Sequence, residues 1–365
     1  MDIVIVGHVD HGKSTVIGRL LADTGSLPEG KLEQVKENCE RNSKPFEYAF
    51  LIDALKDEQA QGITIDSARV FFKSPKRDYI IIDAPGHIEF LKNMVSGAAR
   101  AEAALLVIDA GEGVRENSKR HGYMLSMLGV RQIAVIVNKM DLVGYDESVY
   151  NSIVDEYGAF LKEIDIRPKT FIPVSGINGD NITSRINAMP WYSGKSILDA
   201  LDDFTSGKDD ANKPLRMPVQ DVYKFTRFGD SRRIVSGSIL TGSLTVGDEV
   251  VFYPSGKKSR IRSIEGFQTK ETKTMAAPYP AGFTLDKQIY ITRGEMAANS
   301  HEAKPLVSSR IRASLFWLGR NPMVKQKPYL LKIGSAKVQA RLEQVHRVID
   351  ASDLSCTEQK EMIER

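Results

Sequence analysis

Cysteine is scarce in this chain, which has only Cys39 and Cys356 among its 365 residues. Two cysteines cannot supply a metal quartet or a disulfide framework, which excludes the zinc-stapled and disulfide-stapled classes of small domain. Free thiols are typical of a reducing compartment. We therefore interpret both side chains as small apolar residues with no redox or metal role.

The chain also lacks an excess of charge and a long apolar run. Lys and Arg number 50 against 47 Asp and Glu, a formal charge of +3, so bulk electrostatics predict no DNA or membrane partner. No stretch approaches the roughly 18 apolar residues of a membrane span, and the start, MDIVIVGHVD, has no basic region of a signal peptide. These absences predict a cytoplasmic protein.

Up to about residue 205, short apolar runs alternate with amphipathic stretches. This alternation predicts a mostly parallel six-stranded sheet with helices on both faces, an α/β fold over residues 1–207. The expected strands are residues 3–6, 79–82, 103–108, 133–137 and 170–174, with residues 67–72 as an antiparallel edge strand. The expected helices are residues 14–22, 89–99, 117–128 and 149–164.

The pattern changes after residues 207–214, GKDDANKP, which form a polar linker. Beyond it, brief strands are split by Gly237, Gly242 and Gly247, a pattern that predicts a small antiparallel β-barrel domain over residues 208–300. A third β-like stretch begins near residue 305, and the chain closes in a polar, helix-like segment, TEQKEMIER.

A phosphate-binding loop is predicted at residues 7–14, GHVDHGKS, which match GxxxxGK[ST] between a β run and a helix. Backbone N–H groups at a helix N-terminus attract phosphate oxygens, and glycine permits the tight turn. Lys13 would reach the β- and γ-phosphates, and the Ser14 hydroxyl would bind Mg²⁺. The predicted phosphate-binding residues are Gly7, His8, Val9, Asp10, His11, Gly12, Lys13, Ser14 and Thr15.

A second motif follows the next expected parallel strand, and its residues are Asp83, Ala84, Pro85, Gly86 and His87. A carboxylate at this strand end can hold the Mg²⁺ hydration shell, and the Gly86 N–H can contact a γ-phosphate. Thr64, within residues 62–66, lies between the two motifs, and its hydroxyl is a candidate Mg²⁺ ligand once a γ-phosphate orders the loop. The predicted metal ligands are Ser14, Thr64 and Asp83.

A base-binding site is predicted where the run IAVIV ends in four residues, Asn138, Lys139, Met140 and Asp141. The Asp141 carboxylate can accept hydrogen bonds from N1–H and the exocyclic amine of guanine, whereas adenine presents the wrong donor pattern. Lys139 would lie along the ring, and Asn138 would connect this loop to the phosphate loop. Backbone contacts to the guanine O6 are expected from Ser175, Gly176 and Ile177. The predicted ligands are GTP and GDP with Mg²⁺.

Together these motifs resemble the translation-factor class of GTPases, because GHVDHGKS, GITID, DAPGH, NKMD and VSG occur in that family's order. The resemblance covers essentially the whole chain. It implies that His87 positions the attacking water, with Lys13 and Thr64 completing the catalytic set. It also implies a full third barrel, for which residues 301–365 are too short, so we expect a partial and truncated third β-barrel domain there.

Two sub-families share these motifs: the elongation factors Tu and 1-alpha, which carry aminoacyl-tRNA, and the GTPase subunit of bacterial sulfate adenylyltransferase. The segments KRHGYMLSMLGVRQ, NKMDLVGYDE and PWYSGKSILDAL look more like the sulfate-activating subunit, as does SLFWLGRNPMVKQKPYLLKIG farther on. His11 and Ala84, where that subunit usually has aspartate and threonine, match the elongation factors instead.

We therefore predict a GTP-hydrolysing subunit of a sulfate adenylyltransferase complex that couples GTP hydrolysis to adenylyl sulfate synthesis in sulfate assimilation. Its expected partner is a catalytic adenylyltransferase subunit. The alternative is an elongation factor Tu/1-alpha-like GTPase that delivers aminoacyl-tRNA to the ribosome. A third hypothesis is a GTP-binding scaffold that does not hydrolyse GTP.

Overall fold

The computed structural model describes residues 1–43, 45–52, 69–83, 95, 98–99, 101–205, 207–224, 229, 232–265, 272–349, 356–358 and 362–363. The chain divides into two compact units. One comprises Met1–Phe204 with Ile349–Cys356, and the other comprises Thr205–Val348 with Thr357–Arg365. Among the described residues, none of the helices has the length and apolar character needed to cross a membrane.

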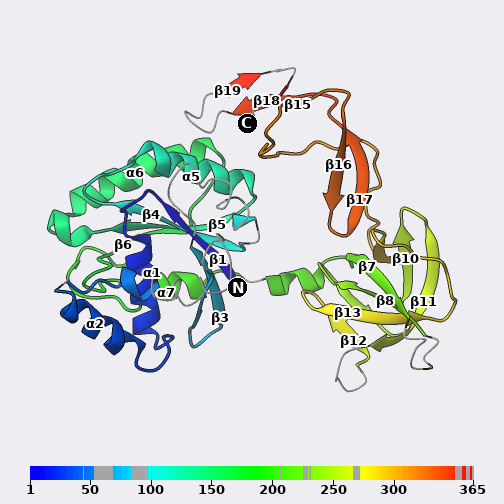
Figure 1. Ribbon diagram of the computed structural model, residues 1–365, viewed down its shortest axis with the longest axis horizontal. Helices are drawn as coiled ribbons and strands as arrows, with labels where there is room; N and C mark the ends of the chain where they lie inside the picture. Colours follow the sequence, from blue (N-terminus) through cyan, green and yellow to red (C-terminus); the bar gives the residue numbers. More distant parts are fainter. Residues whose placement is uncertain are drawn as a thin grey trace. The chain divides into compact units, whose positions relative to one another are not determined.

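The first unit is built on a six-stranded sheet in the order β2-β3-β1-β4-β5-β6 (Figure 1). The strands are β1 (Asp2–Gly7), β2 (Arg69–Lys73), β3 (Asp78–Asp83), β4 (Ala103–Asp109), β5 (Gln132–Asn138) and β6 (Thr170–Pro173). The pairs β3–β1, β1–β4, β4–β5 and β5–β6 are parallel, and the edge strand β2 is antiparallel to β3. Every residue of β4 is buried, because helices cover both faces of the sheet. The predicted sheet, including its antiparallel edge strand, is confirmed.

Helices flank the sheet on both sides in Figure 1, with α1 (Lys13–Asp23) and α7 (Ile197–Asp202) on one face and α5 (Glu116–Met127) and α6 (Glu147–Glu163) on the other. The side chain of Asp146 caps α6 by accepting a hydrogen bond from the Ser148 amide. The helices predicted at residues 14–22, 117–128 and 149–164 are confirmed. The helix predicted at residues 89–99 falls almost entirely outside the described residues.

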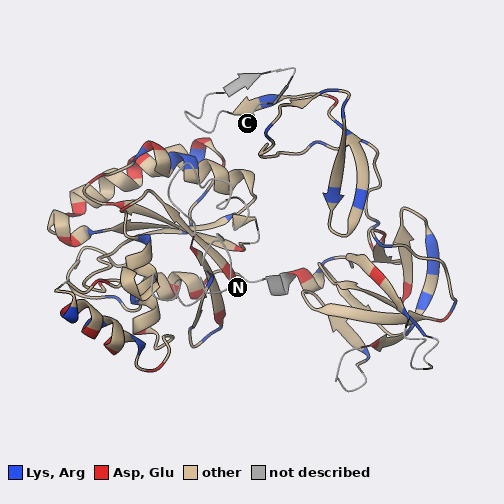
Figure 2. Cartoon of the chain, in the orientation of Figure 1, with Lys and Arg blue, Asp and Glu red and all other residues tan. Residues whose placement is uncertain are grey.

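The polar stretch that begins at Thr24 contains a helix that the sequence analysis did not predict, α2 (Lys31–Arg41). Its buried apolar residues are Val35 and Cys39, which pack with Leu51 in a small separate core, and Leu32 is partly buried against the same core. The rest of the helix is charged, with acidic and basic residues interspersed (Figure 2). A helix with so narrow an apolar stripe depends on tertiary packing, which periodicity alone does not reveal.

The second unit contains a closed antiparallel barrel in the order β10-β11-β13-β8-β7-β14. Its strands are β7 (Met217–Lys224), β8 (Arg233–Ser238), β10 (Glu249–Tyr253), β11 (Lys257–Glu265), β13 (Pro280–Leu285) and β14 (Met296–Asn299), and β9 (Ser243–Thr245) pairs with β12 (Thr274–Ala276). Met217, Phe252 and Phe283 fill its core. The predicted barrel is confirmed, although residues 207–212 form a short 3₁₀ helix, η3, where a linker was expected.

Gly237 does not end a strand, as the sequence analysis assumed, but lies inside β8. A Cβ at Gly237 would collide with the Pro218 carbonyl oxygen of the adjacent strand, so close backbone approach requires the glycine. Gly242 and Gly247 do occupy left-handed turns, with φ of 76° and 96°.

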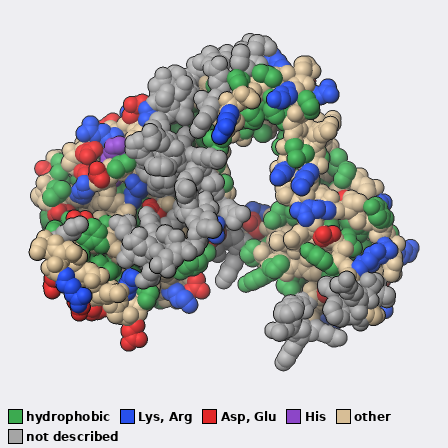
Figure 3. Space-filling view, viewed as in Figure 1, with side chains coloured by type: hydrophobic (Ala, Val, Ile, Leu, Met, Phe, Trp, Pro, Cys, Tyr) green, Lys and Arg blue, Asp and Glu red, His purple; other side chains and the backbone are tan. Residues whose placement is uncertain are grey.

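The described part of residues 301–365 contains short strands rather than a closed barrel. They are β15 (Met323–Val324), β16 (Pro328–Ile333), β17 (Ala336–Arg341), β18 (Arg347–Ile349), β19 (Cys356–Glu358) and β20 (Met362–Ile363). The predicted helical ending is wrong in the described part, because β20 pairs antiparallel with β15 and nine residues are too few to be a stable helix alone. Hydrophobic and basic side chains lie exposed over the β16–β17 hairpin (Figure 3).

Candidate functional site

The predicted nucleotide-binding motifs meet at one edge of the sheet. Parallel pairing places the ends of β1, β3, β4 and β5 side by side, with Ile5 opposite Asp83, Gly7 opposite Val107, and Asp109 opposite Asn138. Ligands of open α/β sheets bind beyond the carboxyl ends of their strands. The topology therefore brings together residues that the sequence separates by more than a hundred positions.

The phosphate loop, residues 7–14, turns directly from β1 into α1. Gly12 precedes the helix in a left-handed conformation (φ 83°), and a Cβ there would collide with the Asn138 side-chain amide. The Lys13 ammonium folds back over the loop, where it donates to the carbonyl oxygens of Gly7 and His8 at 2.8 and 2.7 Å. This loop has the helix N-terminus and the lysine that a phosphate group requires.

Asn138 joins three segments of the site. Its side-chain Nδ2 donates to the His11 carbonyl at 2.9 Å, and its Oδ1 accepts from the Gly176 amide at 3.0 Å. The side chain is nearly inaccessible, so these bonds are made in a desolvated environment. The predicted connection between the NKMD loop and the phosphate loop is present, and it extends to the loop after β6.

Lys139 forms an ion pair that the sequence analysis did not anticipate. Its Nζ lies 2.7 Å from Asp109 Oδ2, and Asp109 Oδ1 accepts hydrogen bonds from the amides of Gly111 and Glu112. Burial raises the pKa of Asp109, but the hydrogen bonds from Lys139 and these amides outweigh it and lower the pKa overall. The pair fixes the stem of Lys139 beside the predicted base site. In the sequence, Asp109 is marked only as the carboxylate that ends the apolar run 103–108, and the sheet places it opposite Asn138 at the end of β5.

A cluster of histidines underlies the phosphate loop. The His11 ring is fully buried; its Nδ1 donates to the Val107 carbonyl at 3.1 Å, and burial lowers its pKa. His8 Nδ1 accepts from the Asn117 side-chain amide at 2.7 Å. His121 of α5 is 4% exposed, and burial, reinforced by the nearby charge of Lys13, lowers its pKa to about 3. The His11 ring is therefore part of the packing beneath the phosphate loop.

The loop after β6 carries Ser175, Gly176 and Ile177. Ser175 Oγ accepts from the Asn178 amide at 3.2 Å, which shapes the turn. The Ile177 carbonyl accepts from Arg19 Nη1 of α1 at 2.9 Å, and its side chain is 63% exposed. An exposed apolar side chain here leaves a surface against which a base could stack.

Of the remaining predicted site residues, some lie in the described part of the chain and others lie outside it. Asp83 is buried at the end of β3, Ser14 and Thr15 are half-buried in α1, and the Met140 amide donates to the Val174 carbonyl. Asp141 is half-buried in the short helix η2 (Met140–Val143). The predicted residues that lie outside the described part of the chain are Thr64, Ala84, Pro85, Gly86 and His87.

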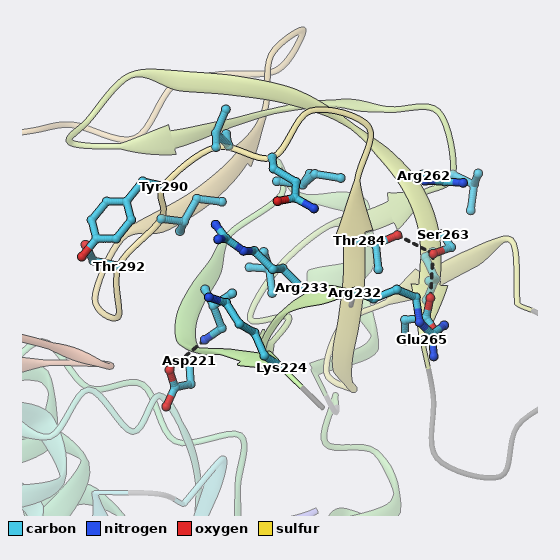
Figure 4. Close-up of a pocket in the computed structure, with 18 of the residues that line it drawn as sticks. Asp221, Lys224, Arg232, Arg233, Arg262, Ser263, Glu265, Thr284, Tyr290 and Thr292 are labelled. Carbon is cyan, nitrogen blue, oxygen red and sulfur yellow. Dashed lines mark hydrogen bonds and ion pairs between the residues drawn. The ribbon is translucent and has the colours of Figure 1, made fainter. Parts of the chain in front are cut away.

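The barrel contains a separate cleft of about 1090 Å³, which Figure 4 shows. Lys224 of β7 and Arg233 of β8 are directly opposed in register and extend into it beneath the loop that carries Tyr290 and Thr292. In the described part of the chain neither cation has a hydrogen bond or ion pair. Figure 2 also shows basic residues along β11, so this side of the barrel is positively charged.

Comparison with known proteins identifies the family of this chain. Residues 1–206 match the elongation factor Tu GTP-binding domain. The chain is 38% identical over 354 residues to sulfate adenylyltransferase subunit 1 of Chromobacterium violaceum, covering 96% of this chain and 73% of that protein. For subunit 1 of Alteromonas mediterranea the identity is 34% over 351 residues, with 95% and 74% covered. Elongation factor 1-alpha of Pyrococcus horikoshii is 36% identical over 362 residues, with 96% and 83% covered.

The chain therefore belongs to the family of GTPases that share the elongation factor Tu GTP-binding domain. GTP and GDP are the nucleotides of this family, in agreement with the guanine site predicted from NKMD. The two kinds of relative, subunit 1 of sulfate adenylyltransferase and elongation factor 1-alpha, are the two that the sequence analysis distinguished.

Proposed function

We propose that this protein is the GTP-hydrolysing subunit of a sulfate adenylyltransferase complex. The observation that best supports nucleotide binding is that the Asn138 side chain joins the phosphate loop, the NKMD loop and the loop after β6. The sulfate-activating role is supported by the subunit 1 relatives, which align along nearly the whole chain at 34% and 38% identity.

The proposed roles of the site residues follow from this arrangement. The backbone of residues 7–15 holds the phosphates, Lys13 neutralises charge that develops on them, and Asp141 selects guanine. His87 orients the attacking water, and Gly86, with Ala84 and Pro85 before it, contacts the γ-phosphate. Ser175, Gly176 and Ile177 line the base.

The Ser14 hydroxyl and the Asp83 carboxylate are hard oxygen groups of the kind that Mg²⁺ prefers, and Thr64 would complete the set. Within the described residues no cluster of three or more His, Cys, Asp or Glu side chains could hold a metal by itself. Mg²⁺ keeps several waters and shares its ligands with substrate phosphates, so the proposed site needs few protein oxygens. When bound, the ion would neutralise charge on the β- and γ-phosphate oxygens.

A catalytic adenylyltransferase subunit is the proposed partner, in the cytoplasm. We propose a GTP-binding domain over residues 1–207, a barrel domain over 208–300 and a partial third barrel over 301–365. The test is coexpression of this chain with a bacterial catalytic adenylyltransferase subunit. The proposal requires that the two copurify and that GTP raises the rate of adenylyl sulfate synthesis. Absence of both association and GTP stimulation would refute it.

The alternative is a carrier of aminoacyl-tRNA, favoured by the elongation factor 1-alpha relative and by the basic cleft of the barrel. That function predicts GTP-dependent protection of the aminoacyl ester from hydrolysis. Protection without association with the catalytic subunit would decide for the alternative.

A further inference from the structure

The phenol of Tyr145 connects the two loops on which guanine recognition depends. Its hydroxyl donates to Asp180 Oδ2 at 2.7 Å and accepts from Asn178 Nδ2 at 2.9 Å. Tyr145 follows the NKMD segment, whereas Asn178 and Asp180 belong to the loop that carries Ser175, Gly176 and Ile177. Burial, and then the Asp180 acceptor, raise the pKa of Tyr145, so it keeps its proton at neutral pH.

The backbone of Tyr145 is fixed to the segment that holds Asp141. The Tyr145 amide donates to the Met140 carbonyl at 2.8 Å, and the Gly144 amide donates to the Asp141 carbonyl at 3.3 Å. The Tyr145 carbonyl accepts from Trp191 Nε1 at 3.0 Å. Any displacement of the Tyr145 side chain is therefore transmitted to the turn that presents Asp141.

The acceptor Asp180 is itself held in place by burial and by backbone hydrogen bonds. Its side chain is buried, and its backbone exchanges two hydrogen bonds with Ser175, from Asp180 N at 3.1 Å and from Ser175 N at 3.3 Å. Hydrogen bonds to a buried carboxylate are stronger than neutral ones and more sensitive to the loss of the partner. Asp180 thus holds the phenol in a fixed place relative to Ser175.

We propose that Tyr145 is a positioning residue for guanine selectivity, which holds the Met140–Val143 turn against the 175–181 loop so that the Asp141 carboxylate meets both guanine donors. Asn138 connects the same two loops at the start of this segment and Tyr145 connects them at its end. The inference rests on the proposed GTP binding, because it concerns the same base site.

The test compares Tyr145→Phe with the matched control Tyr150→Phe, which removes a phenol that donates to the Phe171 carbonyl at 3.0 Å. Affinities are measured for GDP and for inosine diphosphate, which lacks the exocyclic amine that Asp141 would accept. We expect the preference for GDP over inosine diphosphate to fall about tenfold in Tyr145→Phe, the size of one charge-assisted hydrogen bond. The control should keep the wild-type preference.

A purely structural role for Tyr145 would weaken both nucleotides equally or lower only the unfolding temperature, and either result overturns the inference. If Tyr145→Phe does not fold, Asp180→Asn, which keeps an acceptor but removes the charge, should reduce the same preference, and an unchanged preference overturns the inference. A wild-type protein that binds neither nucleotide would instead refute the proposed GTP binding.

Discussion

Asn138 and His11 are 127 residues apart in the sequence, yet the Asn138 side-chain amide donates to the His11 carbonyl at 2.9 Å. The same side chain accepts from Gly176, so one buried amide holds three loops together. Neither contact involves a nucleotide. The structure around the phosphate loop is therefore organised by the protein's own hydrogen bonds.

Asn138→Ala removes both bonds and leaves the Gly176 amide and the His11 carbonyl buried without partners. Because an unsatisfied buried group costs about 1–3 kcal/mol, we expect the free energy of unfolding to fall by about 2–4 kcal/mol. GDP affinity should fall with it. Denaturant unfolding and nucleotide titration measure the two effects. Asn151→Ala, on the exposed face of α6, is the matched control and should change neither quantity.

Asp141→Asn exchanges two acceptor oxygens for an amide that donates on one side. The variant can no longer accept two hydrogen bonds from guanine but matches xanthine, which carries an oxygen in place of the amine. We expect GDP affinity to fall roughly a hundredfold and xanthosine diphosphate affinity to rise. Asp155→Asn, on the exposed face of α6, is the control. Unchanged GDP binding by Asp141→Asn would disprove the assigned base site.

His87→Ala should retain GTP binding but lose most hydrolysis, because the attacking water is no longer oriented. Loss of a group that positions a nucleophile costs roughly a hundredfold or more in rate. Single-turnover hydrolysis of bound GTP is the measurement, with His301→Ala, an exposed residue of the second unit, as the control. A wild-type chain with no measurable hydrolysis would favour the GTP-binding scaffold instead.

His121 makes the folded state sensitive to acid. Its pKa is about 3 in the folded protein against an ordinary 6.5, so below pH 6.5 the unfolded chain binds a proton that the folded chain does not. The free energy of unfolding is therefore undiminished by this group above pH 6.5, and it decreases as the pH falls from 6.5 towards 3. At pH 5 the free energy of unfolding is lower by about 2 kcal/mol on account of this histidine.

His121→Gln removes that titration. Between pH 7.5 and pH 5, the free energy of unfolding should fall by about 2 kcal/mol less in the variant than in the wild type. Denaturant unfolding at the two pH values gives the comparison. Since His11 also has a lowered pKa and is retained in both proteins, the variant should keep part of its acid sensitivity. Equal losses in the two proteins would contradict the assignment to His121.

The opposed cations of the barrel predict a gain in stability. Lys224 and Arg233 face each other across β7 and β8, and like charges in this position repel. Lys224→Glu would convert the pair to an attractive one, and we expect the barrel to gain about 0.5 kcal/mol, measured by thermal unfolding. Lys258→Glu, opposite Val251, is the control and should gain less. The substitution should also weaken binding of a polyanion such as heparin.

Much of the first unit was predictable because burial on both faces leaves a direct trace in the sequence. Residues 103–108 of β4 and 133–137 of β5 are continuous apolar runs, as expected for strands that are buried on both faces. Helix α2 left no such trace, since its apolar face is narrow, with Val35 and Cys39 buried and Leu32 partly buried, and their partner Leu51 comes from another segment. The role of Gly237 was misinterpreted because the need for glycine at this position comes from the Pro218 carbonyl of the neighbouring strand, which the local sequence does not show.

The site could be predicted where a motif is recognisable in the sequence, as GHVDHGKS and NKMD are, and the bond from Asn138 to the phosphate loop was expected from the second motif. The ion pair and the hydrogen bonds that hold Lys139 and Tyr145 in place were not predictable. Asp109 holds Lys139 from the end of β4, and Asp180 holds Tyr145 from the loop after β6, but no local sequence pattern marks either carboxylate as a partner. Their roles depend on which strand ends are adjacent, and sheet order is a property of the folded chain rather than of any local pattern.

The bond between Asn138 and Gly176 also sets an order of events during synthesis. The phosphate loop is made first, at residues 7–14, but the Asn138 oxygen has no amide to accept from until Gly176 has left the ribosome. Proteins emerge from the N-terminus and their domains fold as units. A nascent chain that carries the complete phosphate motif is therefore not yet able to close its base site. We therefore expect nucleotide capture only late in the synthesis of this domain, after β6 has been made.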